Sequence, residues 1–511
     1  TGVQTCALPI FDSQKCYSYN TTSNRFVPAA NATGANSHYC SGQWSGNFLN
    51  WGSMTRMDAV RKLLYGGMRS TDTSTLTVLE RQFLPTDAHA FAKYYNGSDI
   101  TSLTPFTGIA TTPPTATSST NRTIGSGSFT FTTTLPAEIG DQIQVYVTGS
   151  ASSKWMIGGV TSTGSGTITI DVPTGSYAGS GSSSNWTLNN LSRTGISLCN
   201  MTKGGSGVDQ YSQTNTTPPL IRVASGNYAL WNANERWQCY WSGEKSNTQS
   251  GFTYGFRSNG NKAYFSGINA SAENPNQSSR GLGSGYGTGE YVARVEACNA
   301  SWLGHERCTL YGSTYKPTGL LQAYGDNDQL YFGLMTGSFA KNISGGVLRK
   351  NAGSFSNEVS SSDGTFTGVS GIVSNLNKLR IYGYNYSDGT YIGSDNCTYQ
   401  QTGQVLSGGA TSGGSSANQG NCSTWGNPMS EIYLESLRYL GGNSANSAFT
   451  YGSSSKDATL GLTVATWTDP LNNNNFCAPL NVLNFNASVS SYDDDQMSGV
   501  ADLGSSSTAQ A

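Results

Sequence analysis

The ten cysteines are the side chains best suited to covalent chemistry in this sequence. None forms a CxxC pair, and only three histidines accompany them, so a zinc site of the usual spacing is poorly supported. Neighbouring spacings instead predict local disulfides, which would be Cys16–Cys40, Cys199–Cys239, Cys298–Cys308 and Cys397–Cys422. Cys6 lies in residues 1–10, which we treat as a non-native leader, so Cys477 remains without a predicted partner. Connectivity is not fixed by sequence, and reduced thiols in a cytoplasmic protein are the alternative.

Three consecutive carboxylates, Asp493, Asp494 and Asp495, follow a predicted strand. Adjacent carboxylates repel one another, and a divalent cation is one physical remedy. We therefore hypothesise that Asp493 and Asp495 support Ca²⁺ or Mg²⁺ in the complete protein, with solvated surface charge as the alternative. The segment Gly325–Asp328 also offers oxygen ligands. It lacks a twelve-residue loop ending in Glu, so it predicts a turn.

The remaining candidates for chemistry are aromatic or carboxylate groups. The cluster Trp231, Trp237, Tyr240 and Trp241 could form a sugar-stacking face, although such clusters more often lie in a β core. We find no Gly-x-Ser-x-Gly elbow in a strand–helix setting and no phosphate-binding loop, so no catalytic residue is assigned. Glycoside hydrolysis needs only two carboxylates about 5–9.5 Å apart, which sequence spacing alone does not exclude.

The composition narrows the class of protein. Charged residues make up 11% of the chain, against about 25% in average soluble domains. The net charge is −2 without a basic stripe, which argues against a nucleic-acid partner. No run of about 20 apolar residues predicts a membrane-spanning helix. Glycine is abundant, with 63 residues, and aromatic residues reach 11%, which suits a β-rich protein with apolar surface to bury.

The elements that would position these groups change along the chain. Residues 1–10 read like translated sequencing adapter, so we treat them as a non-native leader. Residues 11–101 predict a helix near Met54, whose apolar positions recur every three or four residues and whose wet side carries Arg56, Asp58, Arg61 and Lys62. A second short helix is expected around Asp87–Tyr95.

Alternating apolar and polar residues predict an all-β insert over 102–195, bounded by Gly/Ser-rich tracts. Residues 196–315 predict a β- and loop-rich, disulfide-linked extension. Over 316–500 we expect the apolar strands Leu330–Met335 and Pro479–Phe485, and a helix with Asn427 as its N-cap and Pro428 at its first position. Met429, Ile432, Tyr433, Leu437 and Leu440 should line the inner face of that helix. Residues 501–511 form a tail.

Apolar strands that alternate with helices predict an α/β fold, with a partly parallel sheet and helices on both faces. The helix near Met54, the two apolar strands and the helix at Pro428 would share that sheet. The all-β insert and long Gly/Ser-rich loops would interrupt it.

Several blocks resemble the PilY family of type IV pilus tip-associated adhesin and biogenesis proteins. They occur in one order and cover about half of the chain. The blocks are Trp44–Gly67 (WSGNFLNWGSMTRMDAVRKLLYGG), Arg69–Tyr94, Tyr228–Cys239, Val292–Cys298, Lys316–Gly337, Gly345–Lys350, Cys422–Leu440 and Ser490–Gln496. The insert Gly125–Leu188 is similar in pattern to a small β module of phage tail fibres.

The resemblance implies that 11–101 and 316–500 form a von Willebrand factor A-like domain. Such a domain holds Mg²⁺ or Ca²⁺ through an Asp-x-Ser-x-Ser loop, which this sequence lacks, so a complete metal site is not carried over. The family resemblance also implies that the protein is a non-enzymatic adhesin and pilus assembly factor, exported through the periplasm to the pilus tip at the cell surface. Its partners would be pilus subunits (minor pilins) and a surface receptor. The alternatives are a secreted polysaccharide-binding or polysaccharide-degrading protein and a structural filament subunit.

Overall fold

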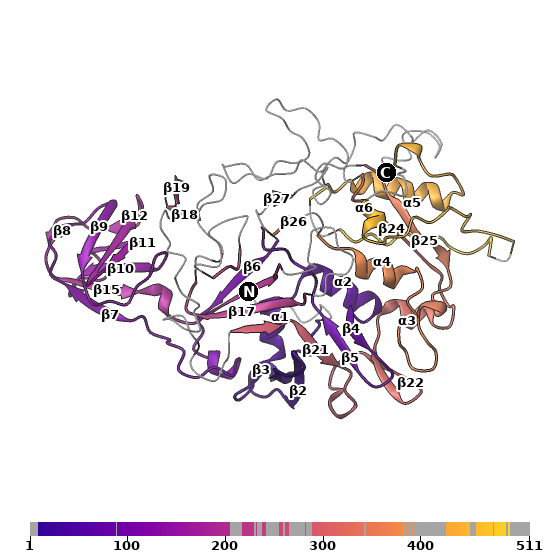
Figure 1. The fold of residues 1–511 in the computed structure, drawn as a ribbon, viewed down its shortest axis with the longest axis horizontal. Helices are drawn as coiled ribbons and strands as arrows, with labels where there is room; N and C mark the ends of the chain where they lie inside the picture. Colours follow the sequence, from indigo (N-terminus) through magenta and orange to yellow (C-terminus); the bar gives the residue numbers. More distant parts are fainter. Residues whose placement is uncertain are drawn as a thin grey trace.

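The computed structural model describes residues 9–204, 217–228, 231, 238–241, 255–258, 261–264, 282, 289–381, 384–386, 390–391, 426–449, 456–486 and 489–490, apart from gaps at 88, 342–343 and 474. Within these residues no helix is long and apolar enough to cross a membrane. One sheet has seven strands. Figure 1 shows this sheet at one end of the molecule, further sheets in the middle, and the helices α3 to α6 towards the other end.

Two sheets pack face to face in the middle of the molecule. The first has the order β3 (Trp44–Ser45), β1 (Lys15–Asn20), β2 (Arg25–Asn31), β21 (Arg294–Ala297), β5 (Thr77–Glu80), β4 (Arg69–Asp72). The second has the order β20 (Glu290–Val292), β17 (Pro219–Ser225), β16 (Ile196–Thr202), β6 (Phe91–Tyr95). Their shared core contains Phe26, Leu79 and Val295 from the first sheet and Leu198 and Val223 from the second. Helix α1 (Gly46–Ser53) adds Phe48 and Leu49 to this core.

The predicted von Willebrand factor A-like α/β fold is wrong. The strands of both sheets pair antiparallel, apart from one parallel contact between β2 and β21. The apolar run Leu330–Met335 yields β24 (Phe332–Thr336), which pairs antiparallel with β25 (Val347–Gly353) in a separate two-stranded sheet. The run Pro479–Phe485 belongs to no described sheet. Apolar runs of this length do not distinguish a strand of a parallel sheet from an isolated hairpin, and that ambiguity caused the error.

The seven-stranded sheet lies between β6 and β16 in the sequence. Its order is β7 (Thr115–Ser118), β15 (Trp186–Asn190), β10 (Gln142–Val147), β11 (Trp155–Gly164), β12 (Thr167–Val172), β9 (Gly127–Thr132), with β13 (Tyr177–Ala178) beside β11. The short strands β8 (Arg122–Thr123) and β14 (Ser182–Ser183) pair with each other. One face of the large sheet forms its own core around Val145, Ile170 and Trp186. These strands lie within the range 102–195 expected for the insert.

The chain leaves the middle sheet and returns to it at neighbouring strands, because β6 pairs antiparallel with β16 from Tyr95 opposite Ile196 onwards. Gly195, at the point of return, has a φ of 70°. A Cβ atom there would lie 2.1 Å from the carbonyl oxygen of Tyr95. Only glycine fits this junction without displacement of the backbone. The same pairing corrects the helix expected around Asp87–Tyr95, because its last five residues form β6.

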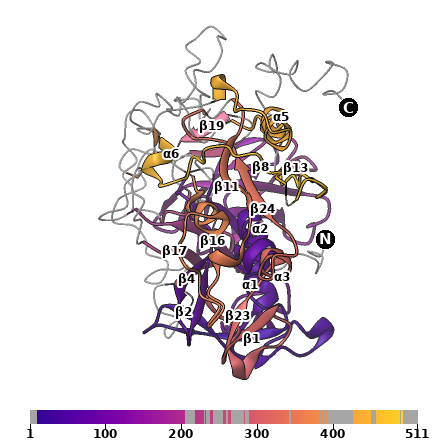
Figure 2. The same cartoon turned by 90° about the vertical axis from the view of Figure 1, so that its right-hand side faces the viewer.

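The region after β21 contains short hairpins and helices around a separate core. It comprises β22 (Cys308–Tyr311), β23 (Thr314–Pro317), α3 (Leu320–Gly325), α4 (Ile372–Lys378), α5 (Met429–Leu440) and α6 (Lys456–Thr459). This region also contains the strand pair β26 (Tyr384–Asn385) and β27 (Thr390–Tyr391). Before β21, the strands β18 (Gly255–Ser258) and β19 (Asn261–Tyr264) form another short pair. Helix α2 (Arg56–Tyr65) packs against α3, as Figure 2 shows, and Tyr65 joins Leu321 and Leu376 in the core.

The helix expected near Met54 is present as α2, which begins with a capping box between Thr55 and Asp58 and is followed by a left-handed Gly66. Its orientation is the reverse of the prediction. Asp58, Arg61 and Lys62 are buried, whereas the apolar positions are only half-buried and Arg56 alone of the expected wet side is exposed. The expectation of a charged outer face is therefore wrong for three of its four members.

The buried polar face of α2 bonds to backbone from distant segments. The Arg61 guanidinium donates to the carbonyl oxygens of Leu376 (2.6 Å) and Leu379 (2.9 Å), at the carboxyl end of α4. Asp58 accepts from the backbone N–H of Gln82 at 2.6 Å. These bonds satisfy groups that would otherwise be buried without partners, and they connect α2 to α4 across more than 300 residues of sequence.

Helix α5 shows the same reversal. Its buried residues are Glu431, Leu434, Glu435, Arg438 and Tyr439, whereas Tyr433 of the expected inner face is 45% exposed. Glu431 accepts from the backbone N–H of Gly345 at 2.5 Å, and Glu435 accepts from that of Asn446 at 3.1 Å. The helix begins one residue later than predicted, with Pro428 as its N-cap.

Candidate functional site

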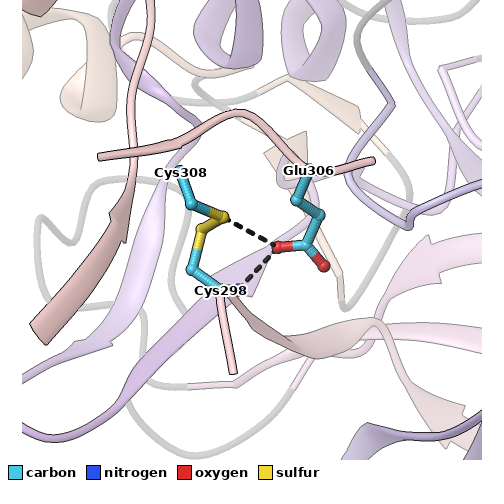
Figure 3. A group of neighbouring side chains, drawn as sticks. All are labelled: Cys298, Glu306 and Cys308. Atoms are coloured by element: carbon cyan, nitrogen blue, oxygen red, sulfur yellow. Dashed lines mark hydrogen bonds between the residues drawn. A yellow bond between two sulfur atoms is a disulfide. The ribbon is translucent and has the colours of Figure 1, made fainter. Parts of the chain in front are cut away.

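Among the described residues, one group of possible metal-ligating side chains comprises Cys298, Glu306 and Cys308, whose donor atoms all lie within 4.8 Å of one another (Figure 3). Cys298 follows β21, where its backbone takes a φ of 52°, and Cys308 begins β22. Glu306 lies on the loop between them. Its Oε2 accepts from the backbone N–H of Cys298 at 2.6 Å and lies 3.8 Å from Sγ of Cys308.

Two cationic side chains lie near this carboxylate. Lys15, 1% exposed, donates to Oε1 of Glu306 at 2.7 Å, and Asp12 lies 3.5 Å from the same ammonium group. Lys62 is also buried, but its Nζ has no hydrogen-bond partner among the described residues. Burial lowers the pKa of Lys62, the Glu306 carboxylate partly offsets this, and the charge on Lys15 lowers the pKa further.

The chemistry of the group depends on its oxidation state. In the structure Cys298 and Cys308 form a disulfide, so neither sulfur is a thiolate able to bind a metal. Lys15 also occupies one oxygen of Glu306. Two sulfurs with one carboxylate do not match the oxygen ligands that Ca²⁺ and Mg²⁺ require. As folded here, the group is a disulfide held in place by a buried ion pair, and the three donors become available to a metal only after reduction.

The structure contains three of the four disulfides named from spacing, which are Cys16–Cys40, Cys199–Cys239 and Cys298–Cys308. Cys397 and Cys422, the fourth pair, lie outside the described residues, as do Cys6 and the proposed metal ligands Asp493 and Asp495. Cys477 is a free, exposed thiol. Gly325–Asp328 forms the end of α3 and the turn that follows it.

The aromatic cluster belongs to a core. Trp231 is fully buried and Trp241 is 6% exposed, and both pack with Tyr228 against the Cys199–Cys239 disulfide. Trp237 lies outside the described residues. The rings of Trp231 and Trp241 are therefore unavailable for stacking on a sugar.

A cavity of about 360 Å³ lies where α4 meets the segment that follows β5. Its lining includes Phe83, Phe366, Gln82, Asn377 and two carboxylates, Glu80 and Glu358. Both carboxylates already have partners. Glu80 accepts from Arg294 at 2.6 Å, and Glu358 accepts from the backbone N–H groups of Ile372 and Val373 at the start of α4. Neither carboxylate is positioned as an unengaged acid or base for glycoside hydrolysis.

The seven-stranded sheet offers a different kind of surface. Its core face is apolar, and its other face presents side chains that alternate with the core positions along β10 and β11. On that face Tyr146 lies opposite Trp155, and Gln144 lies opposite Ile157, all partly exposed. Exposed hydroxyls continue the face across β9, where Thr130 bonds to Thr169.

This face is almost uncharged. Between residues 115 and 190 the charged residues are Arg122, Glu138, Asp141, Lys154 and Asp171. A face of rings, amides and hydroxyls suits contact with a neutral hydroxylated surface better than contact with a polyanion. Tyr146 and Trp155 were not among the residues predicted from the sequence to form a binding site. The signal was present in the alternation of Gln142–Val147, whose outward positions include the polar and amphipathic residues.

Comparisons with known proteins agree with the resemblance seen in the sequence. The family described as "PilY1 homolog, small alpha/beta domain" matches residues 8–140, and "PilY1 homolog, second domain" matches residues 332–511. A Type IV pilus biogenesis factor PilY1 homolog from Xylella fastidiosa is 29% identical over 479 residues, which are 90% of this chain and 24% of that protein. A second protein of the same description and organism is 40% identical over 78 residues, 14% of this chain and 6% of its own length.

The chain thus spans about a quarter, or less, of the length of these relatives. No solved structure matches it. Two family descriptions with the same name cover separate parts of the sequence, and the longer relative aligns along most of the chain. This chain belongs to the PilY1 family.

Proposed function

We propose that this chain is part of a type IV pilus tip-associated adhesin that also assists pilus assembly. The observation that carries the proposal is the alignment of 90% of the chain with a protein named as a type IV pilus biogenesis factor. The protein would be exported through the periplasm to the cell surface, where it would contact minor pilins and a surface receptor. Three disulfides suit an oxidising compartment of that kind.

The seven-stranded sheet supports a role in adhesion. It lies at one end of the molecule (Figure 1), and the chain enters and leaves it at adjacent strands. Its outer face combines Tyr146 and Trp155 with amides and hydroxyls, which can stack on and hydrogen-bond to a neutral glycan. Because charges are scarce there, binding should change little with salt.

Action by binding rather than catalysis is the second part of the proposal. Its support is that Glu80 and Glu358, the carboxylates lining the cavity, are both engaged by other groups. Release of reducing sugars from a panel of polysaccharides tests this point. Robust activity that disappears on substitution of one Asp or Glu would contradict it and favour a polysaccharide-degrading enzyme. Regular filaments formed by the purified chain would instead favour a structural subunit.

The adhesive role is tested in the host by substitution within the complete gene. We expect the double variant Trp155→Ala/Tyr146→Ala to lower attachment about tenfold or more while pili remain normal in number, since each lost ring contact weakens binding by roughly 0.5–1.5 kcal/mol. Tyr331→Ala, the loss of an aromatic ring that is 56% exposed and lies outside this sheet, is the control. Deletion of the whole insert should have at least the effect of the double variant. Normal attachment, piliation and twitching after that deletion would overturn the proposal.

A further inference from the structure

The segment that the sequence predicts as a buried strand, Pro479–Phe485, is exposed along its whole length. Leu483 is 71% exposed, Phe485 43% and Leu480 39%, and the neighbouring Phe476 is 70% exposed. In Figure 1 the yellow end of the described chain extends past β24 and β25 at the right-hand edge of the molecule. Contiguous exposed apolar side chains of this size are unusual on a soluble monomer and mark a surface that contacts something else.

The backbone of this segment is also unpaired. Residues 477–486 contain no helix or ladder, and the backbone groups of Leu480 to Phe485 form no hydrogen bond with the described residues. Just beyond the carboxyl end of the segment, the side chain of Asn427 donates to the side chain of Asn486 at 3.2 Å and to the carbonyl oxygen of Val489 at 3.0 Å. The segment therefore has irregular backbone that is anchored beyond its carboxyl end, and its donors and acceptors have no hydrogen-bond partners among the described residues.

The side-chain pattern shows what kind of partner the segment fits. In an extended strand successive side chains point to opposite faces. If the segment is extended, Leu480 and Val482 share one face and Leu483 and Phe485 share the opposite face, so both faces are partly apolar. Strands with two apolar faces occur in sheets that are covered on both sides. The matching partner is a sheet edge flanked by apolar layers, to which the segment adds as a further strand.

The size of the contact favours a partner in the same polypeptide. Seven extended residues span about 23 Å and, with sheets about 10 Å apart, cover a few hundred Å² on each face. A stable complex between separate proteins buries roughly 1,200–2,000 Å², so this strand is too small to hold a free partner by itself. A tethered partner needs much less area, because the linker supplies a high effective concentration. The aligned parts make up 24% of one relative and 6% of the other, so both contain ample further polypeptide.

We propose that Pro479–Phe485 is a docking strand that completes a β-sheet in another domain of the full-length protein. The strand would fix that domain against the region of α5, β24 and β25. This inference does not depend on adhesion or on a pilus location, and its test measures neither.

Hydrogen–deuterium exchange provides the test, carried out on the 511-residue chain and on the full-length protein. We expect the amides of Leu480–Phe485 to exchange freely in the shorter chain and roughly 100-fold or more slowly in the full-length protein. Strand β25 should be protected in both and is the internal control. Equally fast exchange in both proteins would overturn the proposal. Protection that grows with the concentration of the shorter chain would also overturn it, in favour of pairing between two copies.

Variants of the full-length protein separate docking from folding. Leu483→Asp/Phe485→Asp places charge on one face of the strand and should restore fast exchange from 480 to 485 without changing exchange in β25. Val464→Asp, at a residue that is 55% exposed outside the strand, should leave the protection intact. If the double variant keeps its protection, the apolar face is not what docks, and the proposal fails.

Discussion

Replacement of Arg61 by methionine tests whether buried charge holds the amino-terminal and carboxyl-terminal parts of this chain together. Arg61 is 1% exposed and donates to the carbonyls of Leu376 and Leu379 and to the side chain of Gln82. Methionine fills similar space but donates nothing. At least two buried carbonyls lose a charged donor, at a cost of about 1–3 kcal/mol each. The two carbonyls together give about 2–6 kcal/mol, and with partial compensation from apolar packing we expect a loss of about 2–5 kcal/mol in the free energy of unfolding.

The control is Arg56→Met, the same substitution five positions earlier on α2, where the arginine is exposed. It should change stability by no more than about 1 kcal/mol. Urea unfolding of both variants gives the difference, provided that two probes report the same transition. Exchange of the amides of α4 localises the effect, because its carboxyl-terminal carbonyls are the groups left unpaired. Equal stability of the two variants, or unchanged exchange in α4, would refute this account of the contact.

Three further outcomes follow from the described contacts. Lys62→Met should raise stability by about 1–3 kcal/mol in urea titrations at neutral pH, because it removes a buried amine that has no hydrogen-bond partner among the described residues. Since the pKa of Lys62 is lowered in the folded state, this gain should shrink as pH rises towards 10.5, and a gain independent of pH would contradict the account. Burial lowers the pKa of His89, but the carboxylate of Asp87 at 2.9 Å outweighs burial and raises the pKa above its usual value of 6.5. The stability of the wild-type protein should therefore fall as pH rises through that raised pKa, whereas the stability of His89→Gln should not. By the chain-entropy argument, loss of the Cys199–Cys239 disulfide should lower the free energy of unfolding by about 4 kcal/mol, and loss of the Cys298–Cys308 disulfide by about 3 kcal/mol. The reverse order in calorimetry would show that strain or residual structure dominates.

The spacing of apolar residues near Met54 correctly predicted a helix, which is α2 in the structure. Thr55 and Gly66 cap that helix through contacts between residues a few positions apart. The family resemblance also holds, since it rests on ordered blocks of residues rather than on a fold. The resemblance holds although the described residues do not form the sheet that was expected to join those blocks.

The burial of charge was the main feature that sequence reasoning missed. At least 17 of the 58 charged residues are buried, including Asp58, Glu358 and Glu431. Each of these three carboxylates accepts from backbone N–H groups of a loop or helix start. An amphipathic pattern assumes that charges face water, which fails when a loop-rich chain uses its few charges to satisfy buried backbone. The partners lie too far away in sequence for any local pattern to show them.

The face of the insert was accessible to sequence reasoning only in part. The alternation along β10 and β12 indicates which residues point to opposite sides. It does not indicate which side is covered, because that depends on the curvature of the sheet and on pairing between β12 and β9. Tyr146 and Trp155 come together only through the register of β10 and β11.

The adjacency of β6 and β16 has an evolutionary consequence. Since the two ends of the insert meet at paired strands, the whole module can be lengthened, shortened or exchanged without any change in the order of the surrounding strands. Gly195 and the Tyr95 carbonyl form the seam at which such an exchange would occur. A lineage could thereby acquire a new contact surface by replacement of the sequence between these two ends, while the rest of the molecule keeps its sequence.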